Sequence, residues 1–301
     1  MKHSQESIEM KAATGPSRRS IICRVGSFSI SSVLGLSLFT KKVAAGSGKK
    51  ASAFALIGDR WHNPDYIRTA LTKTLVKGIG LSIDFTNEVT DLSTETLDGY
   101  TLLIIFRDGM IIPEGYKEPF SIYDPRDTTI YSDPPLPEFD EKPQMWMTGT
   151  QGKAVREFVE NGGSAFFWHN ASHISLSNKD FRDVEGAIYT GHPPLIPFKV
   201  KIVNRDHPIT RGVNDFIVTD DQHYVIYDKD PRHVLMKSQN FSVDYTGSHG
   251  SQGRECECCW AYEYGKGRVC FMSPGHMITT LWNPEYIKVQ QNAARWLLRQ
   301  I

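Results

Sequence analysis

Hydrophobic and polar residues follow one another along the chain in blocks typical of alternating strands and helices. Residues 52–57 are an apolar run bounded by a glycine, which predicts a first strand. Residues 63–65, Asn-Pro-Asp, then supply an N-cap, a proline and an early acid. Apolar side chains recur at four-residue intervals, at Ile67, Leu71 and Leu75. This spacing predicts a helix that Gly78 closes.

The same alternation continues through the first half of the chain. Residues 81–85 and 100–106 predict two further strands, and residues 151–161 predict a helix that ends at a double glycine. The next run, residues 164–168, has no polar alternation, as expected for a parallel strand covered on both faces. The pattern predicts an α/β fold with a doubly wound, mostly parallel sheet and helices on both faces.

The rest of the chain is less regular. Residues 109–147 are rich in Pro, Tyr and Asp and have no sustained period, so they form either a functional lid or a surface excursion. An alternating pattern predicts a half-exposed strand at residues 198–203, and Asn283 caps a final helix. The remaining strands are predicted at residues 216–218, 233–236 and 268–272.

Composition narrows the classes of partner. The 301 residues are 40% hydrophobic, enough to bury the core of one large domain. Lys plus Arg and Asp plus Glu both number 34, so no basic excess suggests a nucleic-acid partner. A small-molecule partner fits better, and a homo-oligomer stays open. No G-x-G-x-x-G motif indicates a nucleotide cofactor.

The N-terminal segment resembles a targeting signal. Residues 17–22, Ser-Arg-Arg-Ser-Ile-Ile, form a twin-arginine pattern, followed by a mildly apolar stretch and the small residues 43–45. We therefore expect residues 1–48 to be a twin-arginine signal peptide and linker, and residues 49–301 to be an exported, periplasmic domain. The apolar stretch is too short for stable membrane insertion after signal cleavage. The alternative is a disordered tail with a chance pair of arginines.

Four cysteines lie in the expected mature domain: Cys256, Cys258, Cys259 and Cys270. An even number in an oxidising compartment indicates disulfides or unpaired loop thiols. The Cys-Glu-Cys-Cys spacing lacks the paired C-x-x-C of structural zinc sites, so a soft-metal site is the weaker interpretation.

Chemically active side chains follow several predicted strands. They should meet at the carboxyl edge of the sheet, where open α/β folds bind ligands. His62, His169 and His276 are the candidate catalytic histidines, either as a three-nitrogen set for a divalent metal such as zinc or as base and oxyanion donors. Arg107 and Asp108 are candidate substrate-binding residues, and Arg107 would stabilise negative charge if no metal is bound. For each histidine alone, a hydrogen bond within a loop is the alternative.

A second polar cluster lies at residues 220–224, Asp-Asp-Gln-His-Tyr. Asp221 is a candidate base, and His223 and Tyr224 are candidate substrate-binding residues. A turn stabilised by Asp side chains explains Asp220 at least as well. Trp168 is a candidate platform for a sugar face, although an aromatic residue in a strand is more often part of the core.

Several of these segments together resemble the ThuA-like (trehalose utilisation) family. The resemblance is carried in order by residues 162–171, 207–212, 220–224 and 260–276. It implies a flavodoxin-like fold of the class I glutamine amidotransferase type and a role in sugar catabolism. Those amidotransferases carry a nucleophilic cysteine at the strand-to-helix turn where this chain has His169, so glutamine hydrolysis is not expected.

The resemblance implies an enzyme that acts on a carbohydrate, in particular a 3-keto-glycoside. A ketone at C3 acidifies the C2 proton, so a positioned base can start isomerisation or cleavage by enolisation. Two alternatives remain open at this point: a non-catalytic carbohydrate-binding or accessory protein, and a metal-dependent hydrolase.

Overall fold

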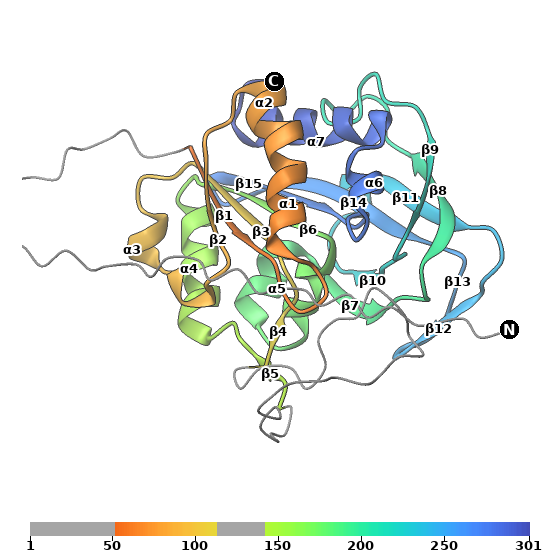
Figure 1. The fold of residues 1–301 in the computed structure, drawn as a ribbon, viewed down its shortest axis with the longest axis horizontal. Coiled ribbons are helices and arrows are strands. Elements are labelled where there is room, and N and C mark those ends of the chain that lie inside the picture. Colours follow the sequence, from red (N-terminus) through yellow and green to blue (C-terminus); the bar gives the residue numbers. More distant parts are fainter. Residues whose placement is uncertain (1–51, 113–141) are drawn as a thin grey trace, which may run out of the picture. The chain divides into compact units, whose positions relative to one another are not determined.

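A nine-stranded sheet forms the centre of the computed structural model, which describes residues 52–112 and 142–301. The strand order is β2-β1-β3-β6-β15-β14-β11-β8-β9 (Figure 1). The first five strands are parallel: β2 (Ile83–Thr86), β1 (Ala53–Ile57), β3 (Leu102–Phe106), β6 (Ser164–Trp168) and β15 (Gly267–Met272). The other four continue the sheet in antiparallel pairs: β14 (Glu255–Tyr264), β11 (Val234–Asn240), β8 (Ile196–Ile202) and β9 (Phe216–Asp220).

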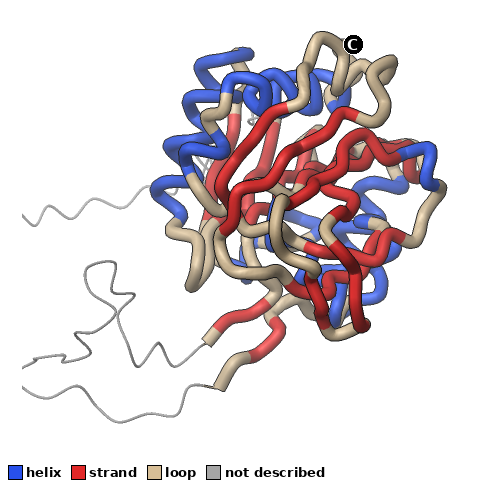
Figure 2. The backbone as a smooth tube through the Cα atoms, turned by 90° about the vertical axis from the view of Figure 1, so that its right-hand side faces the viewer, coloured by secondary structure: helices blue, strands red, loops and turns tan. Residues whose placement is uncertain are grey.

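Helices cover both faces of the sheet, as Figure 2 shows. One face carries α1 (Pro64–Leu71), the π-helical η1 (Thr72–Val76), α2 (Lys77–Ile79), α6 (Ile278–Leu281) and α7 (Pro284–Leu297). The other face carries α3 (Thr94–Leu97), α4 (Gly149–Glu160), the 3-10 helix η3 (His169–Leu176) and α5 (Lys179–Glu185). The predicted α/β fold class is confirmed, and the antiparallel half is the part that the sequence pattern left least defined.

Short elements complete the fold around this sheet. Three two-stranded sheets pair β7 (Ala187–Gly191) with β10 (Tyr224–Tyr227), β12 (Tyr245–Gly247) with β13 (Gly250–Gly253), and β4 (Met110–Ile111) with β5 (Gln144–Met145). Two 3-10 turns are η2 (Val89–Asp91) and η4 (Pro231–His233). No helix among the described residues combines the length and apolar character needed to cross a membrane.

The parallel strands bury side chains on both faces. In β6, Phe166 and Trp168 face the layer of α1 and α7, whereas Ala165 and Phe167 face the layer of α4 and α5. All four are fully buried. This two-sided burial is the physical reason for the continuous apolar run in the sequence.

The first helix begins as the sequence predicts and ends later. The Asn63 side chain caps it by accepting from the Asp65 amide. The helix extends past Gly78, and Gly80 ends it with a φ of 73°. Gly78 lies inside the helix, where a Cβ would meet the end of the Gln291 side chain of α7.

The cysteine-rich segment forms a strand, not the expected loop. Glu255 and Glu257 of β14 are at least partly exposed, while Cys256 and Cys258 are buried, which is ordinary strand alternation. Within the described residues, Cys256, Cys258, Cys259 and Cys270 all have free thiols, so the disulfide interpretation is wrong for this structure. The predicted signal and the central part of the predicted lid lie outside the described residues, and the domain boundary at 48/49 stays a prediction.

Candidate functional site

The segments that follow three strands of the parallel half bring His62, His169 and His276 together. His62 follows β1, His169 begins η3 directly after β6, and His276 follows β15. The His62 ring centroid lies 4.8 Å from that of His169 and 4.7 Å from that of His276. The convergence expected from the strand ends is thus present in the fold.

A buried carboxylate fixes the ring of His62. The Asp59 side chain is 0% exposed, and its Oδ1 lies 2.9 Å from His62 Nδ1. It also accepts from the backbone amides of Trp61 and Asp108 and from the Asn170 side chain, at 2.7–2.8 Å. Burial alone would raise the pKa of the Asp59 carboxyl, but the His62 ring and these donors lower it well below its usual range. Asn170 Nδ2 also lies 2.7 Å from His62 Nδ1, so both Asp59 and Asn170 hold this ring nitrogen. In the tautomer that donates from Nδ1 to the Asp59 carboxylate, Nε2 carries a lone pair.

His169 presents its other ring nitrogen to the same space. Its Nδ1 donates to the carbonyl oxygen of Ser273 at 2.7 Å, so Nε2 carries no proton. That Nε2 is buried and has no hydrogen-bond partner among the described residues. Burial first, and then the fields of His62 and His276, lower the His169 pKa well below its usual value. The imidazole is neutral and has one uncommitted lone pair.

The backbone at His169 is strained. Its φ is 53°, in the left-handed region, which costs a residue with a side chain about 1–3 kcal/mol. Gly275 allows the close approach of the neighbouring loop, because a Cβ there would lie 2.8 Å from the His169 Cβ. Such strain is typical of functional sites, and here it directs the ring inward.

His276 joins the two histidines to Asp221. Its Nδ1 lies 3.0 Å from His62 Nε2 and 2.9 Å from Asp221 Oδ2. The Asp220 carboxylate holds this loop by accepting from the backbone amides of Gly275, His276 and Met277 at 2.9–3.3 Å. Burial opposes both charges, yet the pKa of Asp221 is lowered by its bond to His276, and the pKa of His276 is raised by Asp221. The two groups stabilise each other as an ion pair.

Two overlapping groups of side chains could hold a metal ion. One is His62, His169 and His276, and the other is His169, Asp221 and His223; in each, the ligand atoms lie within 4.8 Å of one another. The His223 ring stacks on His169 at 4.1 Å, and its buried Nδ1 has no partner among residues 52–112 and 142–301. Imidazole and carboxylate donors suit zinc and neighbouring divalent metals.

The surrounding contacts fit a metal centre. Ligating histidines usually donate their second ring nitrogen to a carboxylate or a backbone carbonyl. His62 has such a contact with Asp59, and His169 has one with Ser273. The uncommitted Nε2 of His169 is the atom that a bound cation would satisfy.

Arg107 and Asp108 lie in the loop after β3, beside the histidine cluster and not within it. Arg107 is buried, donates to the carbonyl of Asn87 at 2.9 Å, and lies over the Trp146 ring. The Asp108 carboxylate accepts from the Met110 amide and lies 3.1 Å from His173 Nδ1. These contacts order the loop beside the histidines.

Two predicted substrate-binding residues belong to the core, so those predictions are wrong. Trp168 is fully buried, stacks on Phe166 at 4.2 Å, and donates to the hydroxyl of Tyr286. Tyr224 is also fully buried, and its hydroxyl donates to the carbonyl of Gly253 at 3.0 Å. Neither ring is available to a ligand, because strand geometry directs both into the packed interior.

The sequence pattern did not predict three residues of the site. Asp59 and Asn170 fix His62, and His192 stacks on His223 at 5.1 Å with its Nδ1 3.7 Å from Asp221 Oδ1. Asp59 could have been predicted from the sequence, because it is an acidic residue in the same turn after β1 as His62. His192 could not, because its loop meets the site only through the β7–β10 pair.

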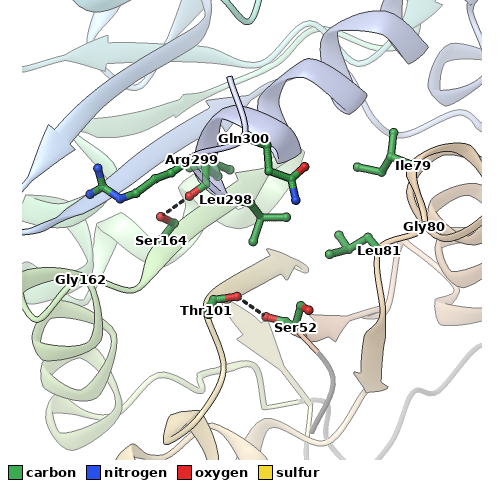
Figure 3. Close-up of a pocket in the computed structure, with 11 residues that line it drawn as sticks. Ser52, Ile79, Gly80, Leu81, Thr101, Gly162, Ser164, Leu298, Arg299 and Gln300 are labelled. Atoms are coloured by element: carbon green, nitrogen blue, oxygen red, sulfur yellow. Dashed lines mark hydrogen bonds between the residues drawn. The ribbon is translucent and has the colours of Figure 1, made fainter. Parts of the chain in front are cut away.

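A separate pocket of about 380 Å³ lies at the opposite, amino-terminal edge of the sheet (Figure 3). Its polar groups bond one another: Thr101 Oγ1 donates to the carbonyl of Ser52, and Ser164 Oγ to that of Leu297. The Arg299 side chain donates to the carbonyl of Lys266. This pocket has no histidine or carboxylate in its lining, so the histidine cluster is the better candidate site.

Comparisons with known proteins agree with this fold. The family model ThuA, described as trehalose utilisation, matches residues 137–297. A ThuA-like protein from Bacteroides uniformis superposes with a TM-score of 0.54 at 17% identity, covering 84% of this chain and 94% of that one. A ThuA-like protein from Parabacteroides merdae gives 0.53 at 15% identity, covering 83% and 90%. At these identities the structures support the fold alone. No curated protein matches the chain.

Proposed function

Because the chain belongs to the ThuA (trehalose utilisation) family, we propose that it is a metal-assisted enzyme of carbohydrate catabolism that acts on a 3-keto-glycoside by enolisation. The family description supports the carbohydrate class. The one observation that carries the chemistry is the buried, unpartnered Nε2 of His169 beside His62 Nε2 and the His276–Asp221 pair.

His62, His169 and His276 would hold the ion. A divalent cation supplies a Lewis acid that stabilises negative charge developing on the C3 oxygen of the sugar. Asp59 and the Ser273 carbonyl orient the first two ligands, and Asp220 fixes the loop that carries the third. The protein thus sets ring orientation and tautomer before any substrate binds.

Asp221 is the proposed base. Its lowered pKa keeps the carboxylate ionised at neutral pH, and its side chain is 10% exposed. The carboxylate takes the C2 proton, and the electron pair of that C–H bond moves into an enolate. In isomerisation the proton returns to carbon. In cleavage the C1–O bond breaks by β-elimination, and the proton passes to the departing alcohol oxygen.

Turnover of 3-keto-glucosides by the metal-loaded protein tests this proposal. We expect activity in the wild type and a loss of at least about 100-fold in Asp221→Asn, the range of general base catalysis. His169→Ala should lose both metal and activity. His249→Ala, in the turn between β12 and β13, is the matched control and should retain both.

Two outcomes would replace the proposal. Sugar binding without turnover by the metal-loaded wild type would favour a carbohydrate-binding accessory protein. Cleavage without exchange of the C2 proton in deuterated water would favour a hydrolase that uses metal-activated water.

We also propose that the protein is exported by the twin-arginine pathway, on the evidence of residues 17–22. Arg18→Lys together with Arg19→Lys should retain a full-length precursor in the cytoplasm, whereas the wild type should appear in the periplasm shortened at the N-terminus. Equal distribution of the two proteins would refute export by this route.

A further inference from the structure

A second pocket lies at the carboxyl edge of the sheet, lined in part by the turn that carries His62. It has a volume of about 310 Å³, at the small end for ligand sites. Its lining comes from the turn after β1, from the end of β3 and from the β4–β5 pair, which extends from that edge in Figure 1. The lining residues are Arg60, Trp61, Asp108, Met110, Ile111, Ile112 and Pro143.

One residue, Asp59, contacts both the histidine cluster and the wall of the pocket. Asp59, which holds the His62 ring, also accepts from the backbone amides of Trp61 at 2.8 Å and Asp108 at 2.7 Å. Both residues line the pocket. The pocket and the histidine cluster are therefore built on the same turn after β1.

The chemistry of the wall is mostly apolar. Met110, Ile111 and Pro143 contribute aliphatic surface, and the Trp61 side chain contributes an indole in a residue that is 45% exposed. The Asp108 carboxylate accepts from the Met110 amide at 2.7 Å and lies 3.1 Å from His173 Nδ1. A second sugar would need several hydrogen-bond partners for its hydroxyls. Among the described lining residues, the charged side chains are Asp108 and Arg60, and the Arg60 guanidinium lies 4.8 Å from the Trp61 ring centroid.

We propose that this pocket binds an apolar aglycone, so that the substrates are glycosides of an aromatic or aliphatic alcohol rather than disaccharides. The inference rests on the proposed function for the sugar end of the site. Burial of a phenyl group against the aliphatic side chains and the indole, whose one face lies under the Arg60 guanidinium, supplies the affinity.

Calorimetric titration of the metal-loaded protein with phenyl β-D-glucoside, methyl β-D-glucoside and trehalose tests the proposal without requiring turnover. We expect phenyl β-D-glucoside to bind at least about 10-fold more tightly than the other two. Ile111→Ser should abolish that difference. Ile217→Ser, which changes an exposed isoleucine of β9, is the matched control and should preserve it.

Trp61→Ala is the second variant, and its partly exposed ring can be removed even if Ile111→Ser fails to fold. Equal affinities in the wild type, or a phenyl preference that survives both pocket variants, would overturn the proposal. Tighter binding of the phenyl glucoside without turnover of any 3-keto-glucoside would support the aglycone pocket and refute the proposed enolisation.

Discussion

His62 Nε2 lies 3.0 Å from His276 Nδ1, although 214 residues separate the two in the chain. In the tautomer with the His62 proton on Nδ1, towards Asp59, a lone pair on Nε2 faces His276. His276 Nδ1 also lies 2.9 Å from Asp221 Oδ2. These three atoms can all present lone pairs to one another. Either a proton on His276 Nδ1 or a metal cation in its place stabilises this arrangement.

We expect the second case, with about one divalent ion bound per chain. Elemental analysis of the purified protein measures it. Removal of the ion by a chelator should lower the melting temperature, since a ligand that binds only the folded state stabilises it. His62→Ala and His276→Ala should each lose the ion, whereas His249→Ala should keep it. A full complement of metal in all three variants would refute this ligand set.

Asp59→Asn should weaken metal binding about 10–100-fold, because a neutral amide no longer fixes the His62 tautomer. The readout is the dissociation constant of the metal, measured by competition with a chelator. Asp65→Asn is the matched control, since its carboxylate is 81% exposed in the first turn of α1. Equal losses in the two variants would show that Asp59 acts only on general stability.

The sequence predicted the part of the site that depends on the order of strands and loops in the parallel half of the sheet. His62, His169 and His276 follow buried apolar runs, and the carboxyl ends of parallel strands meet at one edge. Asp221 and His192 come from the antiparallel half and the small β7–β10 sheet, whose pairing depends on contacts between distant strands. No short-range pattern encodes those contacts.

The wrong predictions for Trp168 and for the cysteine-rich segment also arise because burial depends on the assembled sheet. Trp168 stands directly before His169, yet a strand directs successive side chains to opposite faces, so adjacency in sequence says little about shared surroundings. The cysteine-rich segment looked like a loop because cysteine is a weak strand signal. Its burial between β11 and β15 is a property of the assembled sheet.

Trp168→Phe should lower the free energy of unfolding by about 1–3 kcal/mol, through a lost hydrogen bond to Tyr286 and a small cavity. Urea unfolding measures the loss. The KM for any sugar substrate should stay unchanged, because the ring has no exposed surface. A raised KM with unchanged stability would instead support the earlier interpretation of Trp168 as a sugar platform.

Glu185 gives the fold a pH dependence of its own. Its side chain is fully buried at the end of α5, and neither carboxyl oxygen has a hydrogen-bond partner among the described residues. Burial raises its pKa well above the ordinary value of 4.5, so the folded protein keeps a proton that the unfolded chain releases. Above pH 4.5 the folded state binds more protons, and the free energy of unfolding falls as the pH rises, by at most about 1.4 kcal/mol per pH unit.

Glu185→Gln removes this titration while keeping the shape of the side chain. We expect the variant to be more stable than the wild type at pH 8, with the difference shrinking towards pH 5, because a neutral amide binds no proton in either state. Urea unfolding across this range measures the effect. Glu263→Gln, whose side chain is 67% exposed on β14, should follow the wild type at every pH. Parallel curves for Glu185→Gln and the wild type would show that Glu185 is ionised in the folded protein.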